Sequence, residues 1–440
     1  MPRVLPALAL ALLLAGSMGC AFFVSWPDTM PRTPAEWAAV NRPLDAQGVA
    51  HWREAETRIL WALEKKHPNP WFRLPEADFQ RQVAALDRDL PRLTERQVVL
   101  RWKLILASLG DEHTFLLEQE TGDELWPVAV GLCADGVFVT GASSTTRDLL
   151  GARVVAVGGL PIEAFLRRLE SFEAASVPAY GRLRAAERFP FGWLWLKALG
   201  QLPAHSQPTM EVVLPDGQRE TRTLTPAARS AQVDWTHLPT NPGLLRHADP
   251  DRLYAFRLIE GDRTLYVRYR RCENQKNGPS VWAFTGQVER AAAQAHPQRL
   301  IVDLRGNGGG YSALFWRMLH WIRTTPTFSR PGGLLVLTDA GTFSSAFLNA
   351  LDLQRAGGKI IGTPSGQPLN AYGDIRFTKL PELRPVFACS TKTFLEAPGD
   401  PAAWHRSLTV DVPVPVTRGD LFGQTDTALD AALRQPMPPS

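Results

Sequence analysis

The spacing of hydrophobic residues changes along the chain from a helical repeat to an alternation of short apolar runs and amphipathic stretches. Between residues 33 and 120, apolar side chains such as Trp52, Ile59 and Leu63 recur at helical spacing, which predicts a helical N-terminal domain. From residue 251 to 436, strands and helices are expected to alternate. The expected strands are 264–270, 300–303, 334–338 and 359–362, and the expected helices are 281–295, 313–323 and 345–356. This alternation predicts βαβ units on a mainly parallel sheet, so the fold class is α/β within a multidomain α+β chain.

The region between these two parts, residues 124–228, has the pattern of a small β domain. Its first segments alternate and then run apolar around Asp135-Gly136, a dipeptide that closes hairpins. The stretch 149–159, with the amphipathic segment after it, resembles the part of a PDZ domain that precedes its helix, and 210–224 would supply a second hairpin. A plain β subdomain is the alternative. A PDZ domain binds an extended peptide by adding it as a strand to an open edge.

Two further segments connect these parts. Residues 189–199 are rich in tryptophan, with Trp193 and Trp195, and are expected to form a helical insertion that packs one domain on another. Residues 229–250 contain several proline, asparagine and histidine residues, which is typical of a linker.

The amino terminus, residues 1–20, is predicted to be an export signal. Arg3 precedes an apolar stretch at 8–15 that is too short to span a bilayer. Small residues before Cys20 resemble a bacterial lipoprotein box, in which Cys20 would be lipidated, although Ser17 stands where that box usually has leucine. Lipidation of Cys20 and plain secretion therefore both stay open. In either case the mature chain is expected in the periplasm or cell envelope.

The composition excludes several kinds of partner and site. The 440-residue chain has a formal net charge of +4 that is spread without a long basic run, so no nucleic-acid groove is indicated. Apart from Cys20, the cysteines are Cys133, Cys272 and Cys389, an odd number without a CxxC pair. This excludes a full disulfide framework, allows at most one bridge and argues against a structural zinc site. No metal or organic cofactor is implied, and the oligomeric state is not indicated.

The clearest chemical signal is the stretch LIVDLRGNGGGYS at 300–312. An unbroken apolar run closed by Asp303 and a glycine cluster is the pattern of a buried parallel strand that ends in a tight turn. The consecutive glycines Gly308, Gly309 and Gly310 let backbone N–H groups converge on one bound atom, such as an oxygen that becomes an anion. By itself, such a turn can equally be an ordinary strand-to-helix connection.

Two other residues turn this signal into a hypothesis about catalysis. Ser344 follows an expected strand and precedes an expected helix, where it is either a helix cap or an exposed nucleophile. His113 follows a helix-stopping glycine, where it is either a plain surface histidine or the base that takes the serine proton from about 3 Å away. Oxyanion donors would then come from the amides of Gly308, Gly309 and Ser345.

Several motifs in one order make the chain similar to the tail-specific, or carboxy-terminal processing, serine peptidase family. They are GDEHT, LIVDLRGNGGG, VLTDAGTFSSAFLNAL and IIGTPSGQPLNAYGD. The resemblance covers Asp111–Thr114 and 266–433, and the joint order is much more specific than any single motif. It implies a crotonase/ClpP-like catalytic core in which the glycine turn supplies oxyanion amides. It also implies that Ser344 is the nucleophile, with Ser345 as the neighbouring alternative.

One departure from the family pattern selects a branch. The bacterial processing branch has a catalytic lysine in a GKG motif, whereas here Gly366 is followed by Gln367. The chain instead resembles the tricorn-core branch, in which the histidine of a GD.HT motif is the base, and His113 fills that place. That branch also has a downstream acid that orients the histidine. Asp400 is preferred for this role, and Glu396 is the alternative.

The sequence as a whole therefore predicts an exported serine endopeptidase with a polypeptide substrate and, where Cys20 carries lipid, a membrane anchor. Two alternatives remain. One is a catalytically inactive protein of the same fold that binds peptides or chain ends in the cell envelope, which the missing lysine motivates. The other is a different hydrolase, such as an esterase, that uses the same serine.

Overall fold

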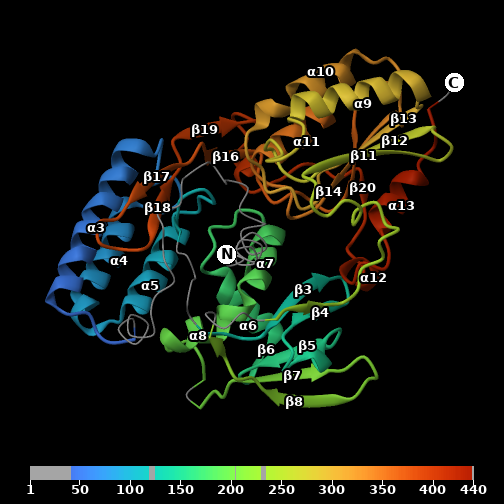
Figure 1. Ribbon diagram of the computed structural model, residues 1–440. Helices are drawn as coiled ribbons and strands as arrows, with labels where there is room; N and C mark the ends of the chain where they lie inside the picture. Colours follow the sequence, from blue (N-terminus) through green and yellow to red (C-terminus); the bar gives the residue numbers. More distant parts are fainter. Residues whose placement is uncertain (1–40, 118–123, 204, 229–233, 439–440) are drawn as a thin grey trace, which may run out of the picture.

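The computed structural model describes residues 41–117, 124–203, 205–228 and 234–438, and Figure 1 shows their arrangement. The expected N-terminal helical domain is present. Its helices are α3 (Ala46–Lys66), α4 (Glu76–Asp89) and α5 (Glu95–Ala107), with a short 3-10 helix at Leu90–Arg92. Asp45 caps α3 by accepting from the Gly48 amide, and Thr94 and Gln97 form a capping box at the start of α5. The apolar faces of the helices meet in one buried cluster.

A hairpin from late in the chain completes this helical domain. Strand β1 (Phe115–Leu117) pairs antiparallel with β18 (Val386–Cys389), which pairs with β17 (Arg376–Lys379). Figure 1 shows β17 and β18 beside the N-terminal helix α3. Their buried side chains Phe387 and Cys389 join the core of the helical domain. The two halves of the chain are thus interleaved, which the sequence-based division into consecutive domains did not anticipate.

The PDZ-like domain is built on an antiparallel sheet. Its strands are β3 (Val128–Cys133), β4 (Gly136–Ala142), β5 (Arg153–Val157), β6 (Leu160–Pro161), β7 (Thr209–Val213) and β8 (Arg219–Thr223). A 3-10 turn at Arg147–Leu149 lies between β4 and β5, and helix α6 (Ile162–Glu170) follows β6. Both expected hairpins are confirmed. Strand β9 (Ala227–Ala228), just before the predicted linker, pairs with β2 (Glu124–Leu125). Within the described part of the linker, β10 (Thr236–His237) pairs with β4.

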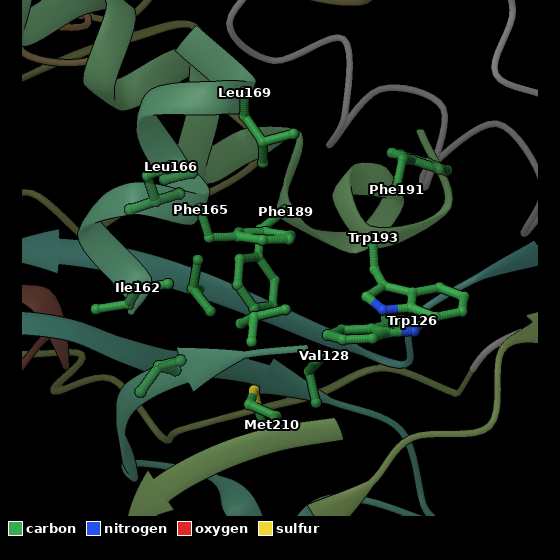
Figure 2. Close-up of a cluster of buried hydrophobic side chains, with 14 of the residues drawn as sticks. Trp126, Val128, Ile162, Phe165, Leu166, Leu169, Phe189, Phe191, Trp193 and Met210 are labelled. Carbon is green, nitrogen blue, oxygen red and sulfur yellow. The ribbon is translucent and has the colours of Figure 1, made fainter. Parts of the chain in front are cut away.

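The helical insertion packs against the sheet and the helix of the PDZ-like domain. It consists of α7 (Pro178–Glu187) and α8 (Phe189–Ala198), which pack against α6 and against β3, a strand that pairs only with β4 among the described residues. Figure 2 shows side chains of α6 and α8 meeting over the start of the sheet. The residues labelled there are Trp126, Val128, Ile162, Phe165, Leu166, Leu169, Phe189, Phe191, Trp193 and Met210. The space beside β3 is therefore filled by the chain itself.

The C-terminal part is organised around a sheet that is parallel except at one edge. The strand order is β11 (Tyr254–Ile259), β12 (Thr264–Tyr269), β13 (Arg299–Asp303), β14 (Leu334–Thr338), β15 (Lys359–Gly362) and β20 (Val412–Pro413). Only β11 is antiparallel to its neighbour. Every residue of β13 and β14 is buried, which is the reason why their sequences read as continuous apolar runs.

Helices cover both faces of this sheet. Alternate residues of the strands point to α9 (Val281–Ala295), α10 (Trp316–Thr324) and α11 (Ser345–Arg355) on one face, and to α13 (Thr427–Leu433) on the other. The remaining elements are β16 (Asn370–Gly373), β19 (Lys392–Leu395), α12 (Arg418–Leu421) and 3-10 turns at Ser312–Phe315 and Pro401–Trp404. The expected fold class is confirmed: a crotonase/ClpP-like core is joined to a PDZ-like β domain and an N-terminal helical domain.

Two sequence expectations concern the membrane and the cysteines. The predicted signal and Cys20 lie outside the described residues. In the part of the chain that the structure describes, the helices are too short or too polar to span a bilayer. Cys133, Cys272 and Cys389 are all free thiols.

Candidate active site

Ser344 lies on a strained turn between β14 and α11. Its φ of 53° and ψ of −126° are unusual for a residue with a side chain, and the side chain makes no capping hydrogen bond to α11. Instead, its Oγ lies 3.2 Å from Nε2 of His113. A serine on a strained strand-to-helix turn, with its hydroxyl directed away from the helix, has the geometry of an exposed nucleophile rather than of a cap.

His113 lies on the loop after α5, and the loop is fixed by a buried carboxylate. One oxygen of Asp111 accepts the backbone N–H of His113 at 3.0 Å, and the other lies 3.0 Å from Nε2 of His67 and also accepts from the Thr114 hydroxyl. Asp111 is 1% exposed, and its pKa is lowered because these bonds outweigh the effect of burial, which raises it. Asp111 and His67 had no role in the sequence-based hypothesis, although Asp111 belongs to the GDEHT motif and accepts the backbone N–H of the histidine.

The electrostatics of His113 favour the neutral ring. Burial lowers its pKa, and this effect outweighs the negative charge of Asp111 and the backbone of Tyr372, which both raise it. The side chain is 4% exposed. A neutral imidazole can accept a proton at Nε2 only if Nδ1 carries the hydrogen. Among the described residues, no side chain accepts from Nδ1, and the backbone of Tyr372, which raises the pKa, is not in full hydrogen-bond geometry with it.

The structure does not bring either predicted acid to His113. Asp400 caps the 3-10 turn at 401–404, accepts from the Ala402 amide at 2.9 Å and pairs with Arg406 at 2.7 Å. Glu396 pairs with Arg355 at 2.9 Å. Both carboxylates are thus held by nearby arginines, and the expected orienting role of Asp400 or Glu396 is not supported by their positions.

The glycine turn packs directly against Ser344, but its amides are used differently from the expectation. The Gly309 N–H donates to Asn307 Oδ1 at 2.9 Å, so it is not free for an oxyanion. A Cβ at Gly309 would lie 2.7 Å from the Cβ of Ser344, which explains the need for glycine at this close approach. The amides of Gly308, Gly310 and Ser345 make no hydrogen bond to any described residue, but only the last two line the cavity beside Ser344.

The neighbouring serine is not a second nucleophile in this geometry. The Ser345 hydroxyl donates to the Gly310 carbonyl at 2.7 Å. This bond fastens the start of α11 to the glycine turn, and it leaves Ser344 as the serine whose hydroxyl meets the histidine.

A buried network of ion pairs fixes the glycine turn to the rest of the core. Arg305 pairs with Asp303 at 2.6 Å and with Asp426, which caps α13, at 2.6 Å, and the Tyr266 hydroxyl donates to Asp303 at 2.6 Å. Burial raises the pKa of Asp303, but the charge of Arg305 and these bonds lower it far more, so the carboxylate stays ionised. The Asp and Arg of the LIVDLRGNGGG motif therefore fix the turn and do not face the cavity.

A cavity of about 220 Å³ opens beside Ser344. Its walls come from the glycine turn, from α11 and from β16 and β19. They include His113, Gly310, Tyr311, Ser344, Ser345, Leu348, Gln367, Tyr372, Asp374, Lys392 and Phe394. Gln367 is 3% exposed, and its Oε1 has no partner among the described residues. In the sequence, Gln367 stands out only because it takes the place of a lysine in the related GKG motif.

The chain is similar in structure to mature CPAF. The structure of mature CPAF complexed with lactacystin aligns over 87% of this chain and 98% of that chain, with 12% identity and a TM-score of 0.59. Another structure of mature CPAF aligns over 88% and 96%, with 12% identity and a TM-score of 0.57. The tricorn protease aligns over 87% of this chain and 36% of that chain, with 12% identity and a TM-score of 0.42. At this identity the likeness to CPAF shows a shared fold, which fits the resemblance to tail-specific serine peptidases.

Scans against protein-family models and against curated proteins gave no match.

Proposed function

We propose that the protein is a serine peptidase in which Ser344 is the nucleophile and His113 is its base. The observation that carries this proposal is the 3.2 Å contact between His113 Nε2 and Ser344 Oγ, made by a serine on a strained turn. The fold shared with mature CPAF and the motif order in the sequence support the same class of reaction.

The reaction follows from the positions of these groups. As Ser344 Oγ attacks the substrate carbonyl carbon, His113 Nε2 takes the hydroxyl proton, and the carbonyl oxygen becomes an anion. The amides of Gly310 and Ser345, which line the cavity, are the proposed donors to that anion. His113 then gives the proton to the departing amine, which leaves an acyl-enzyme. Water attacks the acyl carbon with the same base and releases the acid and free Ser344.

The substrate is proposed from the cavity, and the location from the sequence. An extended polypeptide suits a cavity that has both polar and apolar walls beside the nucleophile. Export to the periplasm or cell envelope rests on the predicted signal at 1–20, with an anchor where Cys20 is lipidated.

A second candidate function is peptide binding without turnover. The observation that favours it is that no side-chain acceptor among the described residues bonds Nδ1 of His113, because an imidazole without an orienting carboxylate is a weaker base. Labelling with a fluorophosphonate separates the two, since the probe modifies an activated serine and a mere binding protein leaves Ser344 unmodified.

The test of the peptidase proposal is hydrolysis of casein and of unstructured peptides by purified protein. We expect Ser344→Ala and His113→Ala each to lower kcat by at least about a thousandfold. Ser345→Ala is the matched control, because its hydroxyl bonds only to the Gly310 carbonyl, and it should retain rates within about tenfold of wild type. Equal activity in wild type and Ser344→Ala would end the proposal, and a panel of simple esters would show whether esters are preferred.

A further inference from the structure

The ring of His113 is held by an aromatic stack. It lies on Phe343, with ring centroids 4.9 Å apart and an interplanar angle of 20°. Phe343 in turn lies on Tyr180, with centroids 4.4 Å apart and an angle of 3°. Because Phe343 directly precedes Ser344, this one ring touches the histidine and is also joined to the nucleophile. Any tilt of Phe343 would therefore change the distance between His113 and Ser344.

Tyr180 leaves Phe343 little room to tilt. It is 8% exposed and forms a small buried apolar cluster with Val177 and Phe343. The backbone of Gly366 also packs against it, because a Cβ there would lie 2.6 Å from the Tyr180 ring. The ring thus packs against both Phe343 and the backbone at 366.

The helix that carries Tyr180 is fastened to the PDZ-like domain. Tyr180 lies in the first turn of α7, the helix that packs against both β3 and α6. Arg182 of α7 pairs with Glu163 and, at 3.4 Å, with Glu170, and both acids belong to α6. The position of Tyr180 is therefore set by the part of the molecule that fills the space beside β3.

The same segment is also tied to the histidine loop. The amide of Ser176, just before α7, donates to the carboxylate of Glu112, the neighbour of His113 in the chain. Arg73 of the helical domain donates to the Ser176 hydroxyl at 3.1 Å. The start of α7 is thus bonded to the loop that carries the base and to the domain from which that loop comes.

The site needs such support because no carboxylate in the described part of the chain orients the imidazole, and its Nε2 meets the Ser344 hydroxyl at 3.2 Å. Nδ1 of His113 has no side-chain acceptor among the described residues, and on that side only the backbone of Tyr372 acts on the ring. The stacking of the imidazole on Phe343, which itself stacks on Tyr180, is the contact that opposes rotation of the ring.

We propose that Tyr180 is a positioning residue of the peptidase site, which acts through Phe343 to hold His113 within hydrogen-bond distance of Ser344. The kinetic part of this inference rests on the proposed function, whereas the contact itself can be tested without turnover. Helix α7 thereby links the PDZ-like domain to the reacting groups.

The kinetic test compares Tyr180→Leu with Tyr180→Phe, which keeps the stack. We expect Tyr180→Leu to lower kcat by about 10- to 100-fold with KM changed by less than about twofold, because a small displacement of the base costs rate rather than binding. Tyr180→Phe should restore the wild-type kcat. The matched control is Phe165→Leu, which removes a buried ring from the packing between α6 and α8 (Figure 2), in a buried cluster separate from that of Phe343. Unchanged kcat in Tyr180→Leu, or an equal loss in Phe165→Leu, would overturn the inference.

A second measurement separates this inference from the proposed function. The ring-proton NMR signals of His113, assigned by their absence in His113→Gln, report on the Phe343 ring that lies over the imidazole. They should move in Tyr180→Leu and stay in place in Tyr180→Phe and Phe165→Leu, with far-UV circular dichroism to show that all variants fold. If wild type hydrolyses substrate no faster than Ser344→Ala, the proposed function fails. The NMR signals of His113 still show whether Tyr180 holds Phe343 against the imidazole. Signals that stay in place in Tyr180→Leu refute the positioning role.

Discussion

At the scale of single residues, Ser344 combines function with local strain. Its φ of 53° and ψ of −126° belong to a region that glycine adopts freely and other residues avoid. A residue held in such a region costs of order 1–3 kcal/mol, which the surrounding structure must offset. The strained backbone is the reason why the hydroxyl faces His113 and not the amides of α11.

This strain can be measured by comparing two inactive variants. Ser344→Ala keeps the strained backbone, whereas Ser344→Gly relieves it at the cost of a more flexible unfolded chain. We expect Ser344→Gly to exceed Ser344→Ala in unfolding free energy by about 1 kcal/mol. Urea unfolding at one pH measures the difference. Equal or lower stability of Ser344→Gly would mean that the turn is not strained.

The burial of His113 determines the pH range of the proposed activity. The base works only when neutral, so kcat/KM should rise with pH through the pKa of His113. Because burial lowers this pKa, the midpoint of the acidic limb is expected below about 6.5, the ordinary value for histidine. A pH–rate profile with an unstructured peptide measures it. A midpoint above 7 would show that a negative charge, and not burial, dominates around the ring.

The residues that could be predicted from the sequence are those whose chemistry is local. His113 and Ser344 stand next to a helix-stopping glycine and a strand-to-helix junction, and both junctions are where the sequence places them. The acid could not be predicted in this way, because Asp400 is tied to Arg406 six residues later and any carboxylate near a tryptophan would have matched equally well. His67 was also out of reach, since its contact with Asp111 spans 44 positions in the chain.

At the scale of elements, the glycine turn depends on close approach rather than on flexibility alone. Gly306 and Gly309 both have positive φ, of 68° and 103°. A Cβ at Gly306 would meet open space, whereas at Gly309 it would meet Ser344 and the Ser345 amide within 2.8 Å. A substitution at Gly306 therefore tests backbone strain alone, whereas one at Gly309 also tests steric contact with the nucleophile.

We expect Gly309→Ala to abolish measurable hydrolysis and Gly306→Ala to lower stability by about 1 kcal/mol with kcat within about tenfold of wild type. The reason is that only Gly309→Ala must move Ser344 or the turn. Steady-state kinetics together with thermal unfolding of both variants checks this. Similar losses of kcat in the two variants would indicate that flexibility of the turn, and not contact with Ser344, matters.

The elements show the same limit of prediction as the residues. The strand 334–338 and the helix 281–295 have the bounds expected from the sequence, because a buried parallel strand and an amphipathic helix each carry their pattern locally. The strands at 370–395 were missed. They are four residues long, and their burial depends on distant partners such as β1, which no local pattern reveals.

At the scale of the whole molecule, the candidate site is assembled from three parts of the chain. The helical domain supplies His113, the core supplies Ser344, and the insertion in the PDZ-like domain supplies Tyr180. The hairpin β17–β18 joins the first two parts, because it extends from the core and pairs with β1. The buried middle residue of β1, Leu116, lies three positions after His113. The Ser390 amide at its end also donates to the Thr114 hydroxyl at 3.1 Å.

This interleaving predicts that loss of packing in the hairpin affects the site more than an equal loss elsewhere. Phe387 in β18 is 0% exposed and pairs in register with Leu116, whereas Phe328, 2% exposed, packs against Trp321 of α10 in a separate buried cluster. Replacing either phenylalanine by alanine should cost about 3–5 kcal/mol of stability. At a temperature where both variants remain folded, we expect Phe387→Ala to lose about tenfold or more in kcat, because the loop of His113 loosens, while Phe328→Ala stays close to wild type.

Hydrolysis rates and fluorophosphonate labelling of Ser344, measured beside urea unfolding, test the difference. Equal rates in the two variants at equal stability would mean that the domains stabilise one another without positioning the base.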